Sequence, residues 1–503
     1  MFLDSGYNAR LRDLKQRLKQ ENPILTEVVD SFRDLDQISR RLGFFRRDES
    51  YATRTSWWPL ISVLGLYSSG KSTFINHYLG NRLQITGNQA VDDKFSVICF
   101  TTEKDVRVLP GVALDADPRF PFYKISQAIE EVSEGEGRRV DAYLQLKTCP
   151  SEALRGKILI DSPGFDADAQ RTSTLRITDR IIDLSDLVLV FFDARHPEGG
   201  SMKDTLEHLV RKTINRHDSN KFLYILNQMD STAGDNNAEE VFAAWQRALA
   251  QYGLTAGRCY AIYVPEASLP IENAEVRSRL EKKCDYYMHK INNRIEQVGV
   301  ERAYRIAGIL EDKARTLKQD VIPGIQQFID SWRRRVFWLD GLIFGSTLFL
   351  FLLVTIKAGY WQGFSLTIPF WEHLPGGRNT RHVLLWLLAG AAVGLHFWIR
   401  RRVAKRVTAK KISKIKDLDL RSNYLRAFHK NSRWHRTLFI PQPLGWSEKS
   451  ADALDKVLQA SNVYIQKLND QYANPSGETV PAANGESRPD DKQQAPDLKA
   501  NSV

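Results

Sequence analysis

Cysteine and methionine are both scarce in this chain, with four of each among 503 residues. No C-x-x-C pair occurs, because the cysteines are spread out as Cys99, Cys149, Cys259 and Cys284. This spacing argues against a disulfide framework and against a zinc site, so we predict reduced thiols in a cytosolic domain. The start of the chain also lacks the apolar core of a signal peptide, so we expect membrane entry only from internal segments.

Length and charge limit the class of protein. A chain of 503 residues is too long for one compact core, so two or more domains are expected. The formal net charge is +11, but dense basic runs lie at 333–335, 400–402 and 405–406, beside two apolar runs. We interpret most of this excess as charge that flanks a membrane, and we predict no nucleic-acid partner.

Two apolar runs have the length of membrane-spanning helices. Residues 336–356 carry one formal charge, Asp340, and residues 383–399 carry none beyond His396. About 20 helical residues cross a hydrocarbon core of about 30 Å, and aromatic residues flank both runs as they do at membrane interfaces. We therefore predict a two-helix transmembrane hairpin joined by residues 357–382. A pair of buried core helices is the alternative.

The distribution of Lys and Arg predicts the orientation of this hairpin. The outer flanks carry three basic residues before the first run and five after the second, whereas the connecting loop has Lys357, Arg378 and Arg381. Both soluble portions, with the N- and C-termini, should face the cytoplasm. The loop is rich in aromatic residues at 359–364 and 368–371, so a deep hairpin that lies in the interface without a full crossing stays open.

A phosphate-binding loop is the strongest motif in the chain. The sequence Gly65-Leu66-Tyr67-Ser68-Ser69-Gly70-Lys71-Ser72 follows an apolar run at 60–64, which predicts a buried strand, and precedes a helical pattern. In that context backbone N–H groups surround phosphate oxygens, and the helix N-terminus adds a favourable dipole. Lys71 would hold the β- and γ-phosphates and Ser72 would bind Mg²⁺. The predicted nucleotide-binding residues here are Gly65, Ser68, Ser69, Gly70, Lys71, Ser72 and Thr73.

Further segments follow in the order that a GTPase-type domain requires. Asp161-Ser162-Pro163-Gly164 closes a strand at 157–160, where Asp161 would reach Mg²⁺ through water and the Gly164 N–H would sense the γ-phosphate. Strands at 187–192, 222–226 and 261–264 complete the pattern. Together they predict an α/β P-loop G domain, a mixed and mostly parallel sheet with helices on both faces.

The base-reading segment is Asn227-Gln228-Met229-Asp230, which follows the strand at 222–226. In the N-K-x-D guanine motif the Asp carboxylate pairs with the base, the Asn fixes neighbouring loops and the Lys stem covers the ring. Gln228 replaces that Lys, so Asn227 and Asp230 keep the polar contacts while the cover is weaker. We also considered Arg195 as a catalytic arginine, with a solvated loop arginine as the favoured interpretation.

These segments resemble those of the dynamin superfamily. The resemblance is carried by residues 65–76, 109–118, 161–164 and 191–195, and it is nearest to the EH-domain-containing branch. It covers about residues 57–269, and no EH domain is visible after it. The hairpin stands where bacterial dynamin-like proteins face the membrane, which implies a multi-pass protein of the bacterial inner membrane. The family implies a helical stalk, dimerisation across the nucleotide, oligomerisation on lipid and a catalytic role for Ser68 beside Lys71 and Asp161.

Two departures from the family pattern affect catalysis and nucleotide choice. The switch I stretch at 88–95 has no Thr to order Mg²⁺ and the attacking water, so Thr86, Thr101, Thr102 or Asp92 would have to substitute, or hydrolysis would be slow. The EH-domain-containing branch resembles adenine users, whereas Asn227 and Asp230 favour guanine. We expect GTP with Mg²⁺, and ATP is the alternative.

Helical patterns fill the rest of the chain. We expect a helical segment at 1–54, the G domain at 55–269, a stalk at 270–335 punctuated by Pro323-Gly324, spans at 336–356 and 383–399 around the loop 357–382, a basic helical region at 400–473 and a disordered tail at 474–503. The leading interpretation is a membrane-anchored dynamin-like GTPase that remodels, tethers or fuses membrane. The alternative is a nucleotide-gated membrane scaffold with little intrinsic hydrolysis.

Overall fold

The structure is a computed structural model. It describes residues 2–86, 94–117, 120, 122, 125–130, 135–164, 172–196, 218–233, 237–251, 253–254, 258–268, 270–367 and 377–472. Most of the predicted switch I stretch (88–93), part of the aromatic loop (368–371) and the predicted tail (474–503) lie outside these ranges.

A mixed sheet forms the core of the G domain, as predicted. Within the described residues it has eight strands in the order β3-β4-β2-β5-β1-β6-β7-β8. The central strands β5, β1, β6, β7 and β8 run parallel to one another, and β2 is antiparallel to β5. The strands are β1 (Leu60–Gly65), β2 (Phe95–Phe100), β3 (Arg107–Pro110), β4 (Leu144–Cys149), β5 (Ile158–Asp161), β6 (Leu187–Asp193), β7 (Phe222–Asn227) and β8 (Arg258–Ala261).

One strand boundary was predicted wrongly. The last strand was expected at 261–264, but β8 ends at Ala261. Beyond Ala261, the Ile262 carbonyl accepts a hydrogen bond from the Met229 N–H at 3.2 Å, in the loop that follows β7. Ile262 and Val264 are nevertheless buried in the core.

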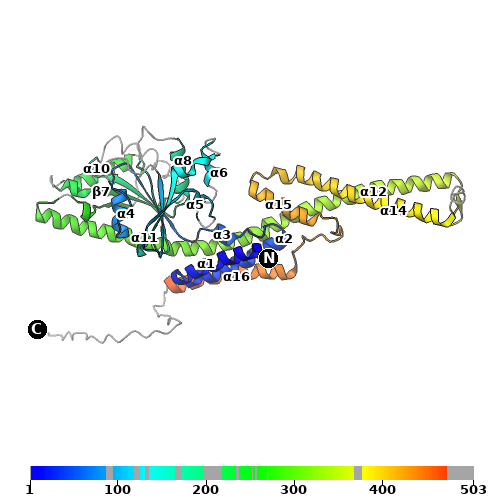
Figure 1. Ribbon diagram of the computed structural model, residues 1–503, viewed down its shortest axis with the longest axis horizontal. Coiled ribbons are helices and arrows are strands. Elements are labelled where there is room, and N and C mark those ends of the chain that lie inside the picture. The colour runs from blue at the N-terminus through cyan, green and yellow to red at the C-terminus, as the bar shows by residue number, and fades with distance from the viewer. Residues whose placement is uncertain are drawn as a thin grey trace, which may run out of the picture.

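Helices cover both faces of this sheet (Figure 1). One apolar cluster joins the sheet to α4, α10 and the first half of α11, and another joins it to α6, α7 and α8. The helices of this part are α4 (Lys71–Leu79), α5 (Val112–Asp115), α6 (Ile125–Glu130), α7 (Val140–Tyr143), α8 (Thr172–Leu184) and α10 (Ala238–Gln251).

A helical bundle with its own apolar core lies beside the sheet. The two ends of the described chain meet in it, because α2 and α16 pack against each other and Ser31 shares a hydrogen bond of 2.8 Å with the hydroxyl of Tyr464. Asn22 caps α2 and separates it from α1. The bundle contains α1 (Phe2–Glu21), α2 (Pro23–Leu42), α3 (Tyr51–Arg54), α15 (Leu418–Asn431), α16 (Glu448–Tyr472) and parts of α11 (Ala274–Thr316), α12 (Ile322–Lys357) and α14 (Gly377–Lys410).

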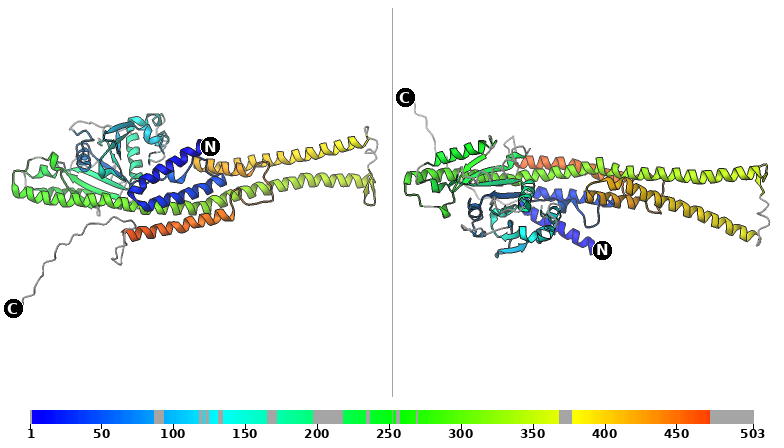
Figure 2. Two further views of the ribbon diagram at one scale, coloured as in Figure 1. Left: turned by 60° about the horizontal axis from the view of Figure 1, so that its bottom comes forward. Right: turned by 90° about the horizontal axis from the view of Figure 1, so that it is seen from above.

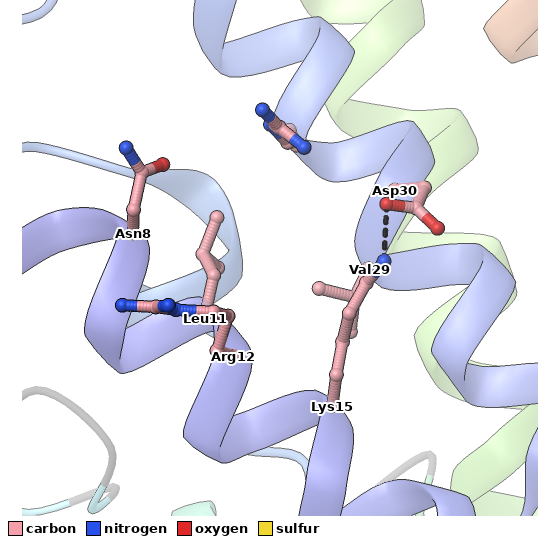
Figure 3. A pocket seen from close by; sticks show the side chains of 7 residues that line it. Asn8, Leu11, Arg12, Lys15, Val29 and Asp30 are labelled. Atoms are coloured by element: carbon pink, nitrogen blue, oxygen red, sulfur yellow. Dashed lines mark hydrogen bonds and ion pairs between the residues drawn. The ribbon is translucent and has the colours of Figure 1, made fainter.

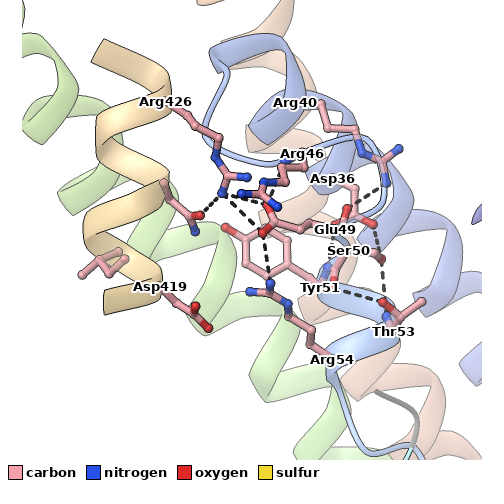
Figure 4. A network of polar contacts seen from close by, with 12 residues as sticks. Asp36, Arg40, Arg46, Glu49, Ser50, Tyr51, Thr53, Arg54, Asp419 and Arg426 are labelled. Atoms are coloured by element: carbon pink, nitrogen blue, oxygen red, sulfur yellow. Dashed lines mark hydrogen bonds and ion pairs between the residues drawn. The ribbon is translucent and has the colours of Figure 1, made fainter. Parts of the chain in front are cut away.

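Charged groups fasten the α2–α3 connection to α15 (Figure 4). Glu49 accepts hydrogen bonds from Arg426 of α15 at 3.0 Å and from Arg54 at 3.2 Å. Asp36 of α2 accepts one from the backbone N–H of Tyr51 at 2.7 Å. These contacts fix the segment that leads from the bundle into the sheet.

Helix α11 belongs to both bodies. Its first half contributes Leu280, Ile291 and Ile295 to the sheet cluster, and its second half contributes Ile306 and Leu310 to the bundle cluster. One helix therefore supplies side chains to both cores. Figure 2 shows this helix running on into α12 along the length of the molecule.

The predicted break at Pro323-Gly324 does not occur. A π-helical turn at Leu317–Val321 joins α11 to α12, and the helical run extends unbroken over Ala274–Lys357. Proline lacks an N–H and would leave a carbonyl of the preceding turn unpaired. Here Pro323 directly follows the π turn at the start of α12, and the wider turn lets the helical run continue through it.

The two apolar runs form a helical hairpin that extends beyond the bundle (Figure 1). The helices that contain them are long and apolar enough to cross a membrane by length and composition, and 6% of each apolar window is buried. Val336 and Ile399, which we had assigned to the spans, are instead buried in the bundle core. Exposure begins one residue later on α12, where Phe337 is 40% and Trp338 is 79% exposed.

Candidate functional site

The phosphate loop contains residues with positive φ, a backbone conformation that suits glycine. Gly65 and Gly70 have φ of 153° and 82°, and Ser68 has a positive φ of 56° that is uncommon outside glycine. A Cβ on Gly70 would lie 2.2 Å from Nδ2 of Asn227, and one on Gly65 would lie 2.5 Å from the carbonyl oxygen of Phe191. The loop is therefore pressed against β6 and against the loop that follows β7.

The first turn of α4 is open for an anion. Gly70 occupies the N-cap and no side chain caps the helix, so its first N–H groups have no side-chain acceptor. Ser72 and Thr73 lie half-buried in this turn. The turn begins where β1 ends, as the strand–loop–helix motif predicts.

Lys71 is buried beneath the phosphate loop. Its Nζ donates hydrogen bonds to the carbonyl oxygens of Gly65 at 3.0 Å and Leu66 at 2.7 Å. Burial lowers the pKa of Lys71 to about 8, and the carboxylate of Asp161 offsets part of that effect. A buried cation whose amine faces two backbone carbonyls is suited to bind an incoming polyphosphate.

Ser72 and Asp161 provide the oxygens that fit Mg²⁺. The Ser72 hydroxyl donates to Oδ2 of Asp161 at 3.2 Å, so a hydroxyl and a carboxylate converge at the end of β5. Hard oxygen donors of this kind suit Mg²⁺, which keeps several waters and takes further oxygens from the substrate phosphates. No group of three or more His, Cys, Asp or Glu side chains that could hold a metal is found among the described residues.

Gln84 is a site residue that sequence reasoning missed. Its Nε2 donates to Oδ2 of Asp161 at 2.5 Å, and its Oε1 accepts from Nζ of Lys147 at 2.5 Å. All three side chains are buried. Asn76 of α4 positions Gln84, because its side chain accepts from the Gln84 N–H at 2.8 Å and donates to the Gln84 carbonyl at 2.8 Å. The carboxylate that would serve the metal is thus oriented by a buried amide.

The predicted base-reading segment is tied to the phosphate loop. Asn227 donates from Nδ2 to the Ser69 carbonyl at 3.0 Å, and Gln228 donates from Nε2 to the Ser68 carbonyl at 2.7 Å. Gln228 thus gains a role that the sequence did not suggest. Asp230 is nearly buried in the short turn that follows.

Arg195 keeps close to its own strand end. Its guanidinium contacts Asp193, with Nη2 2.7 Å from Oδ2, and reaches the phosphate loop only at the Ser68 carbonyl, 3.4 Å away. The hydrogen bond to Asp193 raises the pKa of Arg195 above its ordinary value. The Arg195 side chain is 43% exposed, and whether it takes part in catalysis stays a prediction.

Gly164 packs on the phosphate loop from the β5 side. A Cβ at Gly164 would lie 2.8 Å from the Cα of Tyr67. Gly65, Ser68, Ser69, Gly70, Lys71, Ser72, Asp161, Gly164 and Asn227 are therefore brought together by direct contacts or close approach.

The sheet register removes two of the proposed switch I substitutes. Strand β2 is antiparallel to β5, with Ser96 opposite Asp161 and Cys99 opposite Ile158. Thr101 and Thr102 follow the far end of β2, and five residues of strand place them roughly 16 Å away from Asp161 along the sheet. They cannot replace the missing Thr. Thr86 lies exposed just after Gln84, and Asp92 is outside the described residues.

A separate hollow of about 430 Å³ lies between α1 and α2 (Figure 3). Leu11 and Val29 form its apolar part, and Lys15 and Asp30 pair across it at 2.5 Å. None of the predicted nucleotide residues lines it, so it is not part of this site.

Comparison with known proteins finds similarity over the part of the chain that carries the site. The model of the dynamin family matches residues 61–229. EH domain-containing protein 1 of Homo sapiens is 27% identical over 183 residues, and EH domain-containing protein 3 of Rattus norvegicus is 26% identical over 186 residues. Each match covers 34% of this chain and 31% of the relative, so the chain spans less than a third of the length of these relatives.

A solved structure also aligns with most of the chain. It is described as an oligomerised bacterial dynamin pair that provides a mechanism for the long-range sensing and tethering of membranes. The match has 11% sequence identity and a TM-score of 0.35, and it covers 94% of this chain and 76% of that one.

Proposed function

Because the chain is a member of the dynamin superfamily, we propose that it is a membrane-anchored GTPase that uses nucleotide to remodel, tether or fuse membrane. The observation that carries this proposal is the unbroken helical run over Ala274–Lys357. It starts against the nucleotide-binding sheet, passes through the bundle and ends in the apolar hairpin. One helical run thereby connects the sheet that carries the phosphate loop to the surface that would contact lipid.

The hairpin serves as the membrane anchor in this proposal. Soluble proteins rarely expose large continuous apolar surfaces, yet Phe349 is 66% and Trp386 is 78% exposed. The basic residues at 333–335 and 400–402 lie at the bundle end of the two apolar runs, which favours a cytoplasmic location for the G domain and both termini. The protein would then span the membrane twice, and a bacterial inner membrane fits the likeness drawn from the sequence.

The residues of the site would divide the work of phosphoryl transfer. Lys71 and the N–H groups of α4 would hold the phosphates, Gly164 would sense the γ-phosphate, and Ser68 would compensate charge that develops on the transferring group. Mg²⁺ bound by Ser72 and, through water, by Asp161 would supply electrophilic charge when present. Gln84 would keep the Asp161 carboxylate aimed at that position.

GTP is the proposed nucleotide and ATP the alternative. Asn227 is held against the phosphate loop and Asp230 follows it in the order that guanine recognition needs. Gln228, which replaces the Lys of the guanine motif, is used for the Ser68 contact. Self-association through the G domain would complete the site, as the family implies.

A nucleotide-gated scaffold is the second candidate function. The position of Thr101 and Thr102 at the far end of β2 favours it, because neither can orient the attacking water. In that case nucleotide binding, and not turnover, would set the position of α11.

Steady-state hydrolysis of GTP and ATP by full-length protein in vesicles tests the proposal, with Lys71→Ala as the control. A GTPase gives Lys71-dependent turnover of GTP that rises with protein density. Tight nucleotide binding without Lys71-dependent turnover would contradict the enzyme and favour the scaffold.

A further inference from the structure

The loop that connects α15 to α16 lies at the base of the hairpin (Figure 1) and carries exposed aromatic side chains, as the exposed fractions show. In residues 433–440, called here the basal loop, Trp434 is 74%, Phe439 is 79% and Ile440 is 47% exposed. Leu438 points the other way and is buried in the bundle core. The loop is thus anchored on one side and apolar on the other.

The outward side of the basal loop is continuous with the apolar surface of the hairpin. The ring of Phe439 lies 5.8 Å from that of Phe337 at the start of the apolar part of α12. The ring of Trp434 lies 6.5 Å from that of Phe397 on α14. The loop therefore contacts both helices at the level where their exposed apolar surface begins.

Several backbone carbonyls of the basal loop accept hydrogen bonds from arginine side chains of the hairpin helices. Arg400 donates from Nη2 to the carbonyls of Arg433 at 3.1 Å and Arg436 at 2.6 Å. Arg333 donates to the carbonyl of Leu438 and, at 3.2 Å, to that of Phe439. Unpaired carbonyls are costly away from water, so these arginines remove a penalty that an irregular loop would otherwise carry into an interface.

Charge around the loop matches a lipid headgroup layer. Arg401, Arg402 and Arg433 are exposed beside the aromatic side chains. Tryptophan is enriched at the boundary between hydrocarbon and headgroups, and Lys or Arg near the surface attract anionic lipids. A soluble partner would not account for the continuity with the apolar helices.

We infer that the basal loop is an interfacial anchor, which inserts Trp434, Phe439 and Ile440 into the headgroup boundary of the bilayer beside the hairpin. This inference rests on the proposed membrane insertion of α12 and α14. The loop lies directly between α15 and α16, which packs on α2 and α11, so the anchor fixes the bundle as well as the hairpin to the membrane surface. Arg333 and Arg400 act as positioning residues for the loop.

Site-directed fluorescence in the full-length protein tests the anchor. Phe439→Cys is labelled with an environment-sensitive fluorophore and reconstituted into vesicles of phosphatidylethanolamine and phosphatidylglycerol. The native thiols at Cys149 and Cys284 are buried, and the unsubstituted protein gives the background labelling. Phe349→Cys, in the middle of the apolar part of α12, is the positive control. Tyr286→Cys is the control for a label in water, because Tyr286 is exposed in the half of α11 that packs beside the sheet.

Nitroxide lipids then report the depth of each label. The anchor predicts a blue shift at position 439 and a loss of emission that is larger with a nitroxide high on the acyl chain than with one near the chain end. Position 349 should show the reverse order, and position 286 should show little loss.

Each of the other possible results rejects the anchor, the proposed membrane insertion or both. If the label at position 349 is quenched but the label at position 439 behaves like the one at position 286, the anchor is rejected and the membrane hairpin is kept. A blue shift at 439 without lipid quenching rejects it in favour of a second copy covering the loop. No quenching at either position rejects both the anchor and the proposed membrane insertion.

Discussion

Arg302 of α11 donates a hydrogen bond from Nη1 to Oδ1 of Asp186 at 3.2 Å, and this buried contact joins the G domain to the helical bundle. Asp186 precedes β6, its side chain is 1% exposed, and it also accepts from the backbone N–H of Leu60 at 2.8 Å. Burial lowers the pKa of Arg302 below its ordinary value, although Asp186 opposes that effect. The joint lies at the edge of the sheet opposite the phosphate loop.

Replacing Asp186 with Ala should destabilise this joint. The guanidinium of Arg302 would lose its carboxylate inside the protein, so we expect a loss of about 3–5 kcal/mol in the free energy of unfolding. Urea unfolding in detergent measures it. The control is Lys467→Ala, whose partner Glu27 is half exposed, and where a loss of about 0–1 kcal/mol is expected. Equal losses for the two substitutions would show that the buried Asp186–Arg302 contact stabilises the protein no more than an exposed ion pair does.

Lys71→Ala should abolish tight nucleotide binding. The substitution removes a charged donor from the centre of the phosphate loop, and charge-assisted hydrogen bonds contribute about 1.5–3 kcal/mol each, so we expect a loss of about 100-fold or more in affinity. Titration with a fluorescent GTP analogue measures it. Unchanged affinity would reject the phosphate-loop assignment.

Nucleotide affinity should fall as the pH rises through the pKa of Lys71, which is about 8 in the free protein. Below that pH the lysine is already charged, so its titration does not change the nucleotide affinity. Above it, binding must first protonate the amine, so affinity drops by about tenfold between pH 7 and pH 9. The lowered pKa also affects folding. Between pH 8 and 10.5, the ordinary pKa of lysine, Lys71 binds more protons in the unfolded chain than in the folded protein, so the free energy of unfolding rises with pH in that window.

Lys71→Arg is the matched control for this pH dependence. Arginine stays charged over the whole range, so its nucleotide affinity, whatever its level, should not follow the titration of an amine. A slope in the variant equal to that of the native protein would assign the effect to another group.

Gln84→Met should weaken Mg²⁺ binding while it preserves the volume of the side chain. Methionine cannot donate to Asp161 or accept from Lys147, so two buried hydrogen bonds are lost and stability should fall by about 1–3 kcal/mol. The Mg²⁺ dependence of nucleotide affinity measures the effect on the site. Gln145→Met, which removes a half-buried bond to Ser96, is the control and should leave the Mg²⁺ dependence unchanged. The same Mg²⁺ dependence in all three proteins would argue that Gln84 only supports the fold.

Asp230→Ala should lower the affinity for GTP more than that for ATP. The carboxylate is the group that would pair with the guanine base, so its loss removes a selective contact. Parallel titrations with both nucleotides measure the ratio. Equal losses would mean that Asp230 does not read the base.

Much of the G domain follows from short stretches of sequence. The phosphate loop, Asp161, Gly164 and Asn227 were predicted because each stands at a strand end, and a parallel sheet brings such ends to one edge. The mixed sheet was confirmed, but its final strand was displaced, and β2, β3 and β4 were not predicted.

Other features depend on contacts between distant residues. Gln84 and Lys147 are 63 positions apart and belong to no motif, so nothing local indicated that they meet at Asp161. The Asp186–Arg302 joint and the arginines that hold the basal loop are of the same kind. Local propensity predicts a break at Pro323, whereas the π turn before it lets the helix continue.

The central claim is that nucleotide at the phosphate loop acts on the membrane through the helical run from α11 to the hairpin. The most direct test follows the size and shape of vesicles carrying the reconstituted protein, by light scattering and cryo-microscopy, with GTP, with GDP and without nucleotide, for the native protein and for Lys71→Ala. The account predicts clustering or deformation that needs GTP and is lost in Lys71→Ala. The same change without nucleotide, or in the variant, would contradict it.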